Sequence, residues 1–156
     1  MTTVLYTGGC LLADSRLSEG ESKVFRGSVS KLFELNGRHF TVSGYFALGY
    51  TFAHDLANEA GDLPELDEET TVYELLRDSR LAVHEYGGYG IPYHFEPQVS
   101  VGFGTGGPLA LAAYLGGALP MRAMEIAAQI DPQSGGPFHA VRYDNTKQEF
   151  VTWSTR

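Results

Sequence analysis

Cysteine and basic residues are scarce in this sequence, and long apolar runs are missing. Cys10 is the single cysteine, so an intrachain disulfide is impossible, and its apolar neighbours predict a thiol packed in the core. The 11 Lys and Arg residues are outnumbered by 19 Asp and Glu, which gives a formal net charge of -8. No local cluster of Lys or Arg offsets this charge, so nucleic-acid binding is disfavoured.

Features of membrane, metal and serine-hydrolase proteins are also missing. No run of about 18 uninterrupted apolar residues occurs, and no basic segment leads into an apolar one at the start, so we expect a cytoplasmic protein without a membrane span. The histidines lack the spacing of a zinc site, and no Gly-x-Ser-x-Gly elbow occurs. No metal or other cofactor is expected. The histidines are at positions 39, 54, 84, 94 and 139.

What the chain does contain is the balance of a packed globular protein. Of its 156 residues, 43% are hydrophobic, 12% aromatic and 19% charged. This length suits one domain with a sizeable core and is too short for two domains of ordinary size. We therefore expect a single domain over residues 1–156.

Turn signals and apolar periodicity divide the chain into strands and helices. The Gly8-Gly9 and Asn36-Gly37 pairs predict tight hairpins, and Pro120 suits the first turn of a helix. The predicted strands are 3–7, 10–13, 29–35, 40–46, 72–77, 81–86, 99–103, 138–143 and 149–154. Helices are predicted at 47–60, with Gly61 as its C-terminal cap, at 108–115 and from 120 to 130. This order indicates an α+β protein in which sheet packs on sheet and helices cover the outer faces.

Three segments are predicted as loops. A polar loop is expected after Asp14, up to Ser22. Residues 62–69 are acidic and predict a solvated loop, with a docking site for a basic partner as the alternative. Residues 87–97 mix Gly, Pro, Tyr and His without periodicity, and their aromatic side chains either line a pocket or pack.

A cluster of glycines raises the possibility of dinucleotide binding. Gly102, Gly104 and Gly107 match G-x-G-x-x-G between a predicted strand and a predicted helix. A Rossmann unit, however, needs a return to a second parallel strand that carries an acidic residue, whereas two helices in succession are predicted here. Dinucleotide binding is therefore disfavoured, and the glycines indicate a close approach of the backbone to another group.

Five short motifs, in order, resemble those of the proteasome β-type subunits, and in particular of their bacterial relatives, which include the heat-shock-locus peptidase and short bacterial and phage homologues. The resemblance spans nearly the whole chain. It rests on Thr2-Thr3-Val4 with the following Leu12-Ala13-Asp14-Ser15-Arg16, on Gly27-Ser28-Val29-Ser30-Lys31-Leu32, on Ser43-Gly44, on Gly104-Thr105-Gly106-Gly107-Pro108, and on Asp131-Pro132-Gln133-Ser134-Gly135-Gly136.

The resemblance implies an N-terminal-nucleophile (Ntn) hydrolase fold, a four-layer αββα sandwich, and a threonine nucleophile at Thr2 once Met1 is removed. The free α-amine of Thr2 would act as its base, because the pKa of such an amine is about 8. Lys31 would lower the proton affinity of the Thr2 hydroxyl and amine, and Asp14 would hold Lys31 by an ion pair. Gly44 would supply the oxyanion-hole N–H.

The resemblance assigns a supporting role to three further residues and implies an assembly. Thr105, Asp131 and Ser134 would form a polar cluster behind the amine. The subunits would assemble in a homo-oligomeric ring that cleaves peptides or proteins, with no ATP-driven unfoldase identified. Two alternatives stay open. One is a catalytically silent scaffold that retains Met1, and the other is a hydrolase that acts on a small amide.

Overall fold

The computed structural model describes residues 2–19, 23–28 and 30–155, and most of its strands belong to two five-stranded antiparallel sheets. The first sheet has the order β10-β1-β2-β11-β12, and the second has the order β5-β6-β7-β8-β9. The strands are β1 (Val4–Thr7), β2 (Cys10–Ala13), β3 (Arg16–Glu19), β4 (Lys23–Ser28), β5 (Leu32–Leu35), β6 (Arg38–Ser43), β7 (Thr71–Leu75), β8 (Leu81–His84), β9 (Tyr93–Phe95), β10 (Val101–Phe103), β11 (His139–Asp144) and β12 (Glu149–Ser154).

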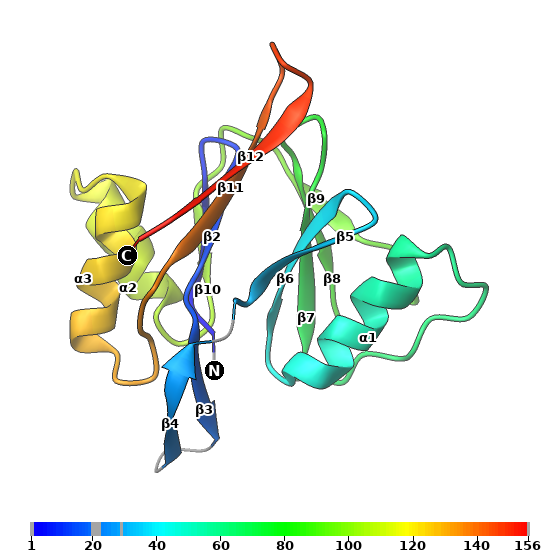
Figure 1. Cartoon of the computed structure of the whole chain (residues 1–156), viewed down its shortest axis with the longest axis horizontal. Coiled ribbons are helices and arrows are strands. Elements are labelled where there is room, and N and C mark those ends of the chain that lie inside the picture. Colours follow the sequence, from blue (N-terminus) through cyan, green and yellow to red (C-terminus); the bar gives the residue numbers. More distant parts are fainter. Residues whose placement is uncertain (1, 20–22, 29, 156) are drawn as a thin grey trace.

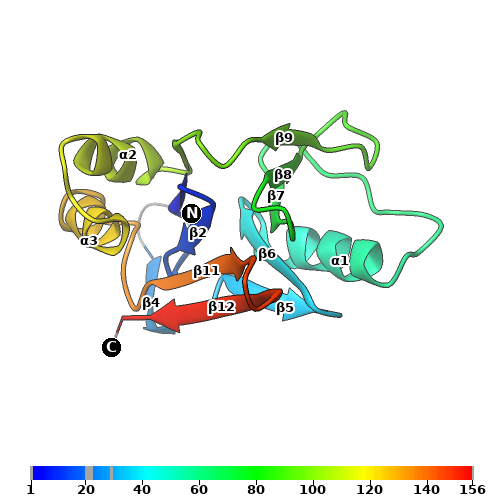
Figure 2. The ribbon, with the colours of Figure 1, turned by 90° about the horizontal axis from the view of Figure 1, so that it is seen from above.

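Helices cover the outer face of each sheet. Helices α2 (Gly107–Leu115) and α3 (Pro120–Ile130) lie on the first sheet, and α1 (Phe46–Ala57) lies on the second, as Figures 1 and 2 show. The predicted α+β, four-layer αββα sandwich is confirmed.

Three apolar clusters fill the spaces between these four layers. The cluster between the sheets contains Val4, Leu11, Tyr73 and Val83 among others. A second cluster joins the first sheet to α2 and α3, and a third joins α1 to the second sheet. The inner strands β1, β2, β7 and β8 are therefore buried along almost their whole length, because successive side chains point to opposite sides and both sides are covered.

The first hairpin has the predicted form. Gly8 and Gly9, with φ of +56° and +75°, connect β1 to β2, and the strands pair from Val4 opposite Ala13 to Thr7 opposite Cys10. One position beyond this ladder, the Asp14 N–H donates to the Thr3 carbonyl at 3.1 Å. The hairpin therefore brings Asp14 beside Thr3. Cys10 is partly buried against the cluster under α2 and α3.

Two loop predictions were wrong. Part of the polar loop predicted up to Ser22 is β3, which pairs with β4 in a two-stranded ribbon that projects from the sandwich (Figure 1). Part of the loop predicted over residues 87–97 is β9, which pairs with β8 at the edge of the second sheet. Apolar periodicity does not reveal these strands. The ribbon projects from the sandwich, and β9 has only three residues at the edge of its sheet. Residues 20–22 and 29, which fell within the predicted loop and strand, lie outside the described residues.

The first helix ends earlier than predicted. It stops at Ala57, and Glu59, with φ of +56°, adopts the left-handed conformation that we expected of Gly61. The N–H of Ala60 donates to the Asp55 carbonyl at 2.9 Å, and that of Glu59 donates to Leu56 at 3.1 Å. This is the Schellman arrangement, which a non-glycine residue occupies here.

The longest described helix has 12 residues, and none in the part of the chain that the structure describes is long and apolar enough to cross a bilayer. Among these same residues, no three His, Cys, Asp or Glu side chains are grouped so that they could hold a metal ion.

Candidate active site

Asp14 is the centre of the candidate site. It follows β2 directly and is completely buried. Its Oδ1 accepts a hydrogen bond from the Thr3 backbone N–H at 3.0 Å, and its Oδ2 accepts one from the Gly135 N–H at 3.2 Å. The carboxylate therefore anchors the residue next to Thr2 and joins it to the connection that follows α3.

Lys31 reaches this carboxylate from the other sheet. It lies just before β5, is 2% exposed, and donates from Nζ to Asp14 Oδ1 at 3.0 Å. Burial lowers the pKa of the Lys31 ammonium and raises that of the Asp14 carboxyl, while the attraction between the two charges opposes both shifts. We treat the pair as ionised, because three N–H groups converge on this one carboxylate.

A chain of hydroxyl groups leads from Thr3 to a second carboxylate. Thr3 Oγ1 and Ser134 Oγ share a short hydrogen bond. Ser134 Oγ donates to Asp131 Oδ2 at 2.5 Å, and Thr105 Oγ1 donates to the same oxygen at 2.8 Å. Burial acts to raise the pKa of Asp131, but hydrogen bonds from Ser134, the Gln133 N–H and Thr105 lower it overall. The predicted residues Thr105, Asp131 and Ser134 are thus in mutual contact.

The glycine-rich turn after β10 closes over the first described residues. Gly104 has φ of +78°, and a Cβ at this position would lie 1.5 Å from the Thr2 carbonyl oxygen. A Cβ on Gly106 would lie 2.2 Å from Thr3 Oγ1. A Cβ on Gly102 would lie 2.1 Å from the Gly107 carbonyl oxygen, so close backbone contacts explain the glycine spacing without a dinucleotide. The described sheets have only antiparallel pairing, and α3 directly follows α2, which also speaks against a Rossmann unit.

Gly44 belongs to the opposite sheet. It follows β6 with φ of +92°, and a Cβ there would lie 2.1 Å from the Glu69 carbonyl oxygen. A side chain is therefore excluded both by conformation and by space. The end of β6 lies at the same end of the sandwich as the start of the chain (Figure 1). Gly44 is therefore separate from the hydrogen-bonded group around Asp14, but it lies at the same end of the space between the sheets.

Two residues that lay within the resembling motifs received no role from the sequence. Thr3 is buried and connects both carboxylates, Asp14 through its N–H and Asp131 through Ser134. Arg16 donates from Nη1 to the Pro132 carbonyl at 2.7 Å and packs on Gly135, where a Cβ would lie 2.5 Å from Arg16 Nε. The sequence contained two signals for Thr3 and Arg16, namely the Thr2-Thr3 pair and the run from Asp14 to Arg16. Neither signal shows which partner each side chain binds.

The arrangement can carry out acid–base chemistry at the start of the chain. Thr2 is 5% exposed, and its neighbour Thr3 lies between the Asp14–Lys31 ion pair and the Asp131 hydroxyl chain. One positive charge is thus fixed close to a threonine, and a hydrogen-bonded relay lies on the other side.

No family model matches the sequence, and no curated protein sequence matches it. A solved structure of Thiobacillus denitrificans BPH in complex with epoxomicin is similar, with a TM-score of 0.57 and 17% sequence identity over 89% of this chain and 95% of that chain. The likeness shows that this chain shares its fold, a sandwich of two antiparallel sheets with helices on the outer faces.

Proposed function

We propose that the chain is an N-terminal threonine hydrolase that cleaves amide bonds, with Thr2 as the nucleophile after Met1 is removed. The observation that carries this proposal is the buried ion pair between Lys31 and Asp14, with Nζ and Oδ1 3.0 Å apart, on a carboxylate that also holds the Thr3 N–H. Burying two charges is unfavourable in itself, so a pair next to a reactive threonine favours a chemical role. The shared fold with an epoxomicin-bound protein supports the same proposal.

In the first half of the reaction, Thr2 Oγ attacks the carbonyl carbon of the substrate and its proton passes to the Thr2 α-amine. The Lys31 charge lowers the pKa of that hydroxyl. The Gly44 N–H stabilises the developing oxyanion, a contribution of about 3 kcal/mol for one such donor. The C–N bond then breaks, the α-ammonium returns the proton to the leaving amine, and the acyl group stays on Thr2 as an ester.

In the second half, water attacks the ester carbonyl while the α-amine accepts its proton. Collapse of the tetrahedral adduct breaks the ester bond, releases the carboxylic acid and restores the Thr2 hydroxyl. Thr105, Asp131 and Ser134 orient the amine and relay protons, since their oxygens form one hydrogen-bonded chain to Thr3.

The test is intact-mass spectrometry of the purified protein before and after incubation with epoxomicin, a peptide epoxyketone. We expect a mass that lacks one methionine, followed by addition of one inhibitor without a leaving group. Both the hydroxyl and the amine of an N-terminal threonine react with an epoxyketone, so the adduct requires a free Thr2.

The matched variants are Thr2→Ala, which removes the nucleophile, and Thr7→Ala, which removes a threonine hydroxyl at the far end of β1. Thr2→Ala is expected to lose labelling and all hydrolysis of a fluorogenic peptide panel, whereas Thr7→Ala keeps both. A processed, folded protein that neither reacts with epoxomicin nor hydrolyses peptides or small amides would contradict the proposal.

A catalytically silent scaffold that keeps Met1 is the second candidate. The observation that favours it is the low exposure of Thr2, which is 5% exposed. An acylated Thr2 nitrogen is no longer a base, so retention of Met1 would abolish the reaction. In that case the intact mass includes Met1, and Thr2→Ala changes no measurable property.

The substrate and the assembly belong to the same proposal. We infer a homo-oligomeric ring acting on peptides, with hydrolysis of a small amide as the alternative, and cytoplasmic location. Comparing the peptide panel with a set of small amides separates the two substrate classes.

A further inference from the structure

A hollow lies on the face of the second sheet that is turned away from the first sheet. It has a volume of about 290 Å³ and lies between the α1–β7 connection and the β8–β9 connection. Along β8, Val83 belongs to the cluster between the sheets, whereas the next residue, His84, packs on Phe52 of α1 with ring centroids 5.1 Å apart. The second sheet therefore separates this hollow from Thr2, which precedes β1 of the first sheet.

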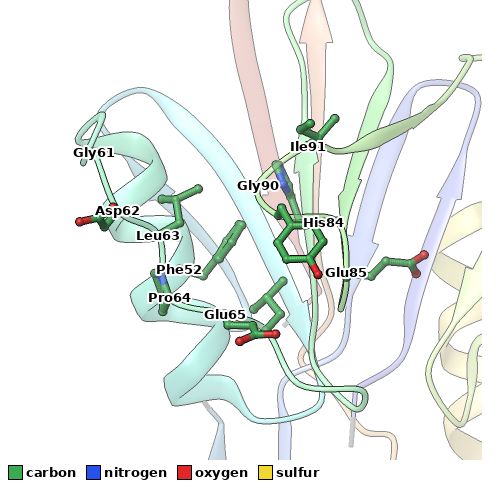
Figure 3. A pocket seen from close by; sticks show the side chains of 14 residues that line it. Phe52, Gly61, Asp62, Leu63, Pro64, Glu65, His84, Glu85, Gly90 and Ile91 are labelled. Atoms are coloured by element: carbon green, nitrogen blue, oxygen red, sulfur yellow. The ribbon is translucent and has the colours of Figure 1, made fainter.

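The walls of the hollow are mainly apolar and come from two sides. Figure 3 shows Phe52 and Leu63 on one side and His84 and Ile91 on the other. Ile91 is 76% exposed and the neighbouring Tyr89 is 89% exposed. Large apolar side chains exposed at the mouth of a cavity are typical of a binding site.

His84 gives the hollow an unsatisfied polar group. Its side chain is 4% exposed, and its Nδ1 has no hydrogen-bond partner among the residues that the structure describes. Burial is the main cause that lowers its pKa to about 4, so the imidazole is neutral near pH 7. A neutral imidazole has one donor and one acceptor nitrogen, and an unpaired buried one favours a ligand that supplies the missing bond.

The charges around the hollow restrict the ligand further. Asp62, Glu65 and Glu85 are lining residues, and no Lys or Arg is among them. The carboxylates of Asp62 and Glu85 point away from the hollow in Figure 3, so they surround it with negative charge and leave its walls apolar. An anionic ligand is therefore disfavoured.

We propose that this hollow binds a small uncharged or cationic phenol, with its ring between Phe52, Leu63 and Ile91 and its hydroxyl hydrogen-bonded to the His84 imidazole. The phenol hydroxyl donates to the unprotonated nitrogen of the neutral imidazole. A volume of about 290 Å³ suits a single substituted ring. The site is independent of the hydrolase reaction, because no step of that reaction uses these residues.

The test is an NMR titration of the ¹⁵N-labelled full chain with tyramine, a cationic phenol, and with its O-methyl ether. Tyramine is expected to shift the amide signals of residues 61–66 and 84–91 and the imidazole ¹⁵N signals of His84, and to saturate. The ether keeps the ring and the charge but loses the donor, so it binds about tenfold more weakly. The anionic phenol 3-(4-hydroxyphenyl)propionate also binds more weakly than tyramine.

Variants at three positions test where tyramine binds. His84→Phe keeps a ring at this position and is expected to weaken tyramine about tenfold while leaving the ether unchanged. His94→Phe, an exposed position outside the lining, is the matched control and leaves tyramine binding unchanged. Thr2→Ala binds tyramine like the unaltered protein, so loss of hydrolysis does not affect the result.

Three outcomes would overturn the proposal: no saturable shift, equal affinity for tyramine and its ether, or shifts confined to other parts of the chain. Should His84→Phe fail to fold, the comparison of the two ligands on the unaltered protein decides alone.

Discussion

At the scale of single residues, the Asp14–Lys31 pair and His84 couple ionisation to folding in two different ways. The Asp14–Lys31 pair lies between the sheets, and His84 lies under α1. Both are removed from water. The charges of Asp14 and Lys31 compensate each other, whereas the imidazole of His84 is kept neutral. This difference determines how each one responds to substitution and to pH.

Removing one partner of the buried pair is expected to cost more than removing both. Lys31→Met leaves Asp14 as an uncompensated buried charge, a loss of about 3–5 kcal/mol in the free energy of unfolding. The double variant with Asp14→Asn loses less than Lys31→Met alone, and so less than the sum of the two single variants, because no unpaired charge remains. Urea unfolding of the three variants measures this coupling.

The control for this series is a pair on the surface. Arg142 Nη1 lies 3.8 Å from Asp144 Oδ2, and the Arg142 side chain is about half exposed. Arg142→Met is expected to change stability by less than about 1 kcal/mol. Strictly additive effects of Lys31→Met and Asp14→Asn would show that the pair is not coupled as the geometry requires.

The stability of the protein is expected to fall in acid because of His84. Burial first, and then the charges of Arg38 and His94, lower its pKa from 6.5 to about 4. Between these two values the unfolded chain binds a proton that the native chain does not, so stability falls as the pH falls from 6.5 to 4. The full loss from this group is at most about 3 kcal/mol.

Urea unfolding at several pH values across this window measures the slope, and His84→Phe should flatten it by the contribution of one proton. Identical slopes for the variant and the unaltered protein would rule His84 out as the titrating group.

At the scale of elements, the connections hold the candidate site together. The turn after β10 contacts Thr2 and Thr3, and the segment after α3 binds Asp14 and Arg16. Asp131 is the C-terminal cap of α3, so the end of this helix positions the hydroxyl chain. The sheets supply the frame, and these two connections supply the contacts with the start of the chain.

Substituting the glycine that contacts Thr2 is expected to disrupt this end of the molecule. Gly104→Ala combines a left-handed φ of +78° with a Cβ only 1.5 Å from the Thr2 carbonyl oxygen. We expect a loss of about 3–5 kcal/mol in unfolding free energy, from backbone strain and overpacking together. Any folded fraction should also lose epoxomicin labelling, because the displaced residue, Thr2, is the proposed nucleophile.

Gly8→Ala is the matched control for Gly104→Ala. Gly8 has φ of +56°, but no atom lies within 4 Å of the added Cβ. Only the strain is added, about 1–2 kcal/mol, and labelling is retained. Equal losses for the two variants would mean that the close approach of Gly104 to Thr2 has no energetic weight.

At the scale of the whole molecule, the sandwich leaves apolar residues exposed where another subunit could cover them. Helix α2 and the turn that follows it show both situations, burial in the core and exposure to solvent. Ala110 is fully buried, and Leu109 and Leu111 pack on the same cluster, whereas Leu115 and Leu119 are mostly exposed at the α2–α3 turn.

If the subunits form a ring through this turn, replacing Leu115 and Leu119 by Asp should lower the assembled mass. The added charge would have to be buried next to a chain that already has a formal net charge of -8. Sedimentation equilibrium measures the mass, and Tyr89→Asp, an exposed residue of the β8–β9 connection, serves as the control. A monomeric mass for the unaltered protein contradicts ring formation.

Much of the fold could be predicted because strong local signals agree with the tertiary structure. The Gly8-Gly9 and Asn36-Gly37 hairpins, the two late helices and the last strand pair occur where the sequence indicates. The β3–β4 ribbon and β9 could not be predicted, because backbone pairing with a neighbouring strand defines them and the three residues of β9 are too few to show a period. The end of α1 was missed because Glu59 occupies a conformation that the sequence assigns to glycine.

The sequence by itself determined the types of polar residue at the candidate site and their order along the chain, because short motifs record them. Only the tertiary structure decided which of them meet. Lys31 reaches Asp14 across two sheets, and Thr3 links two carboxylates that are 117 positions apart, from 14 to 131. The unpaired Nδ1 of His84 has no sequence signal, whereas the aromatic side chains of residues 87–97 were expected either to line a pocket or to pack, and Tyr89 lines the hollow. Such contacts depend on how sheets and connections pack, and a linear pattern does not contain that information.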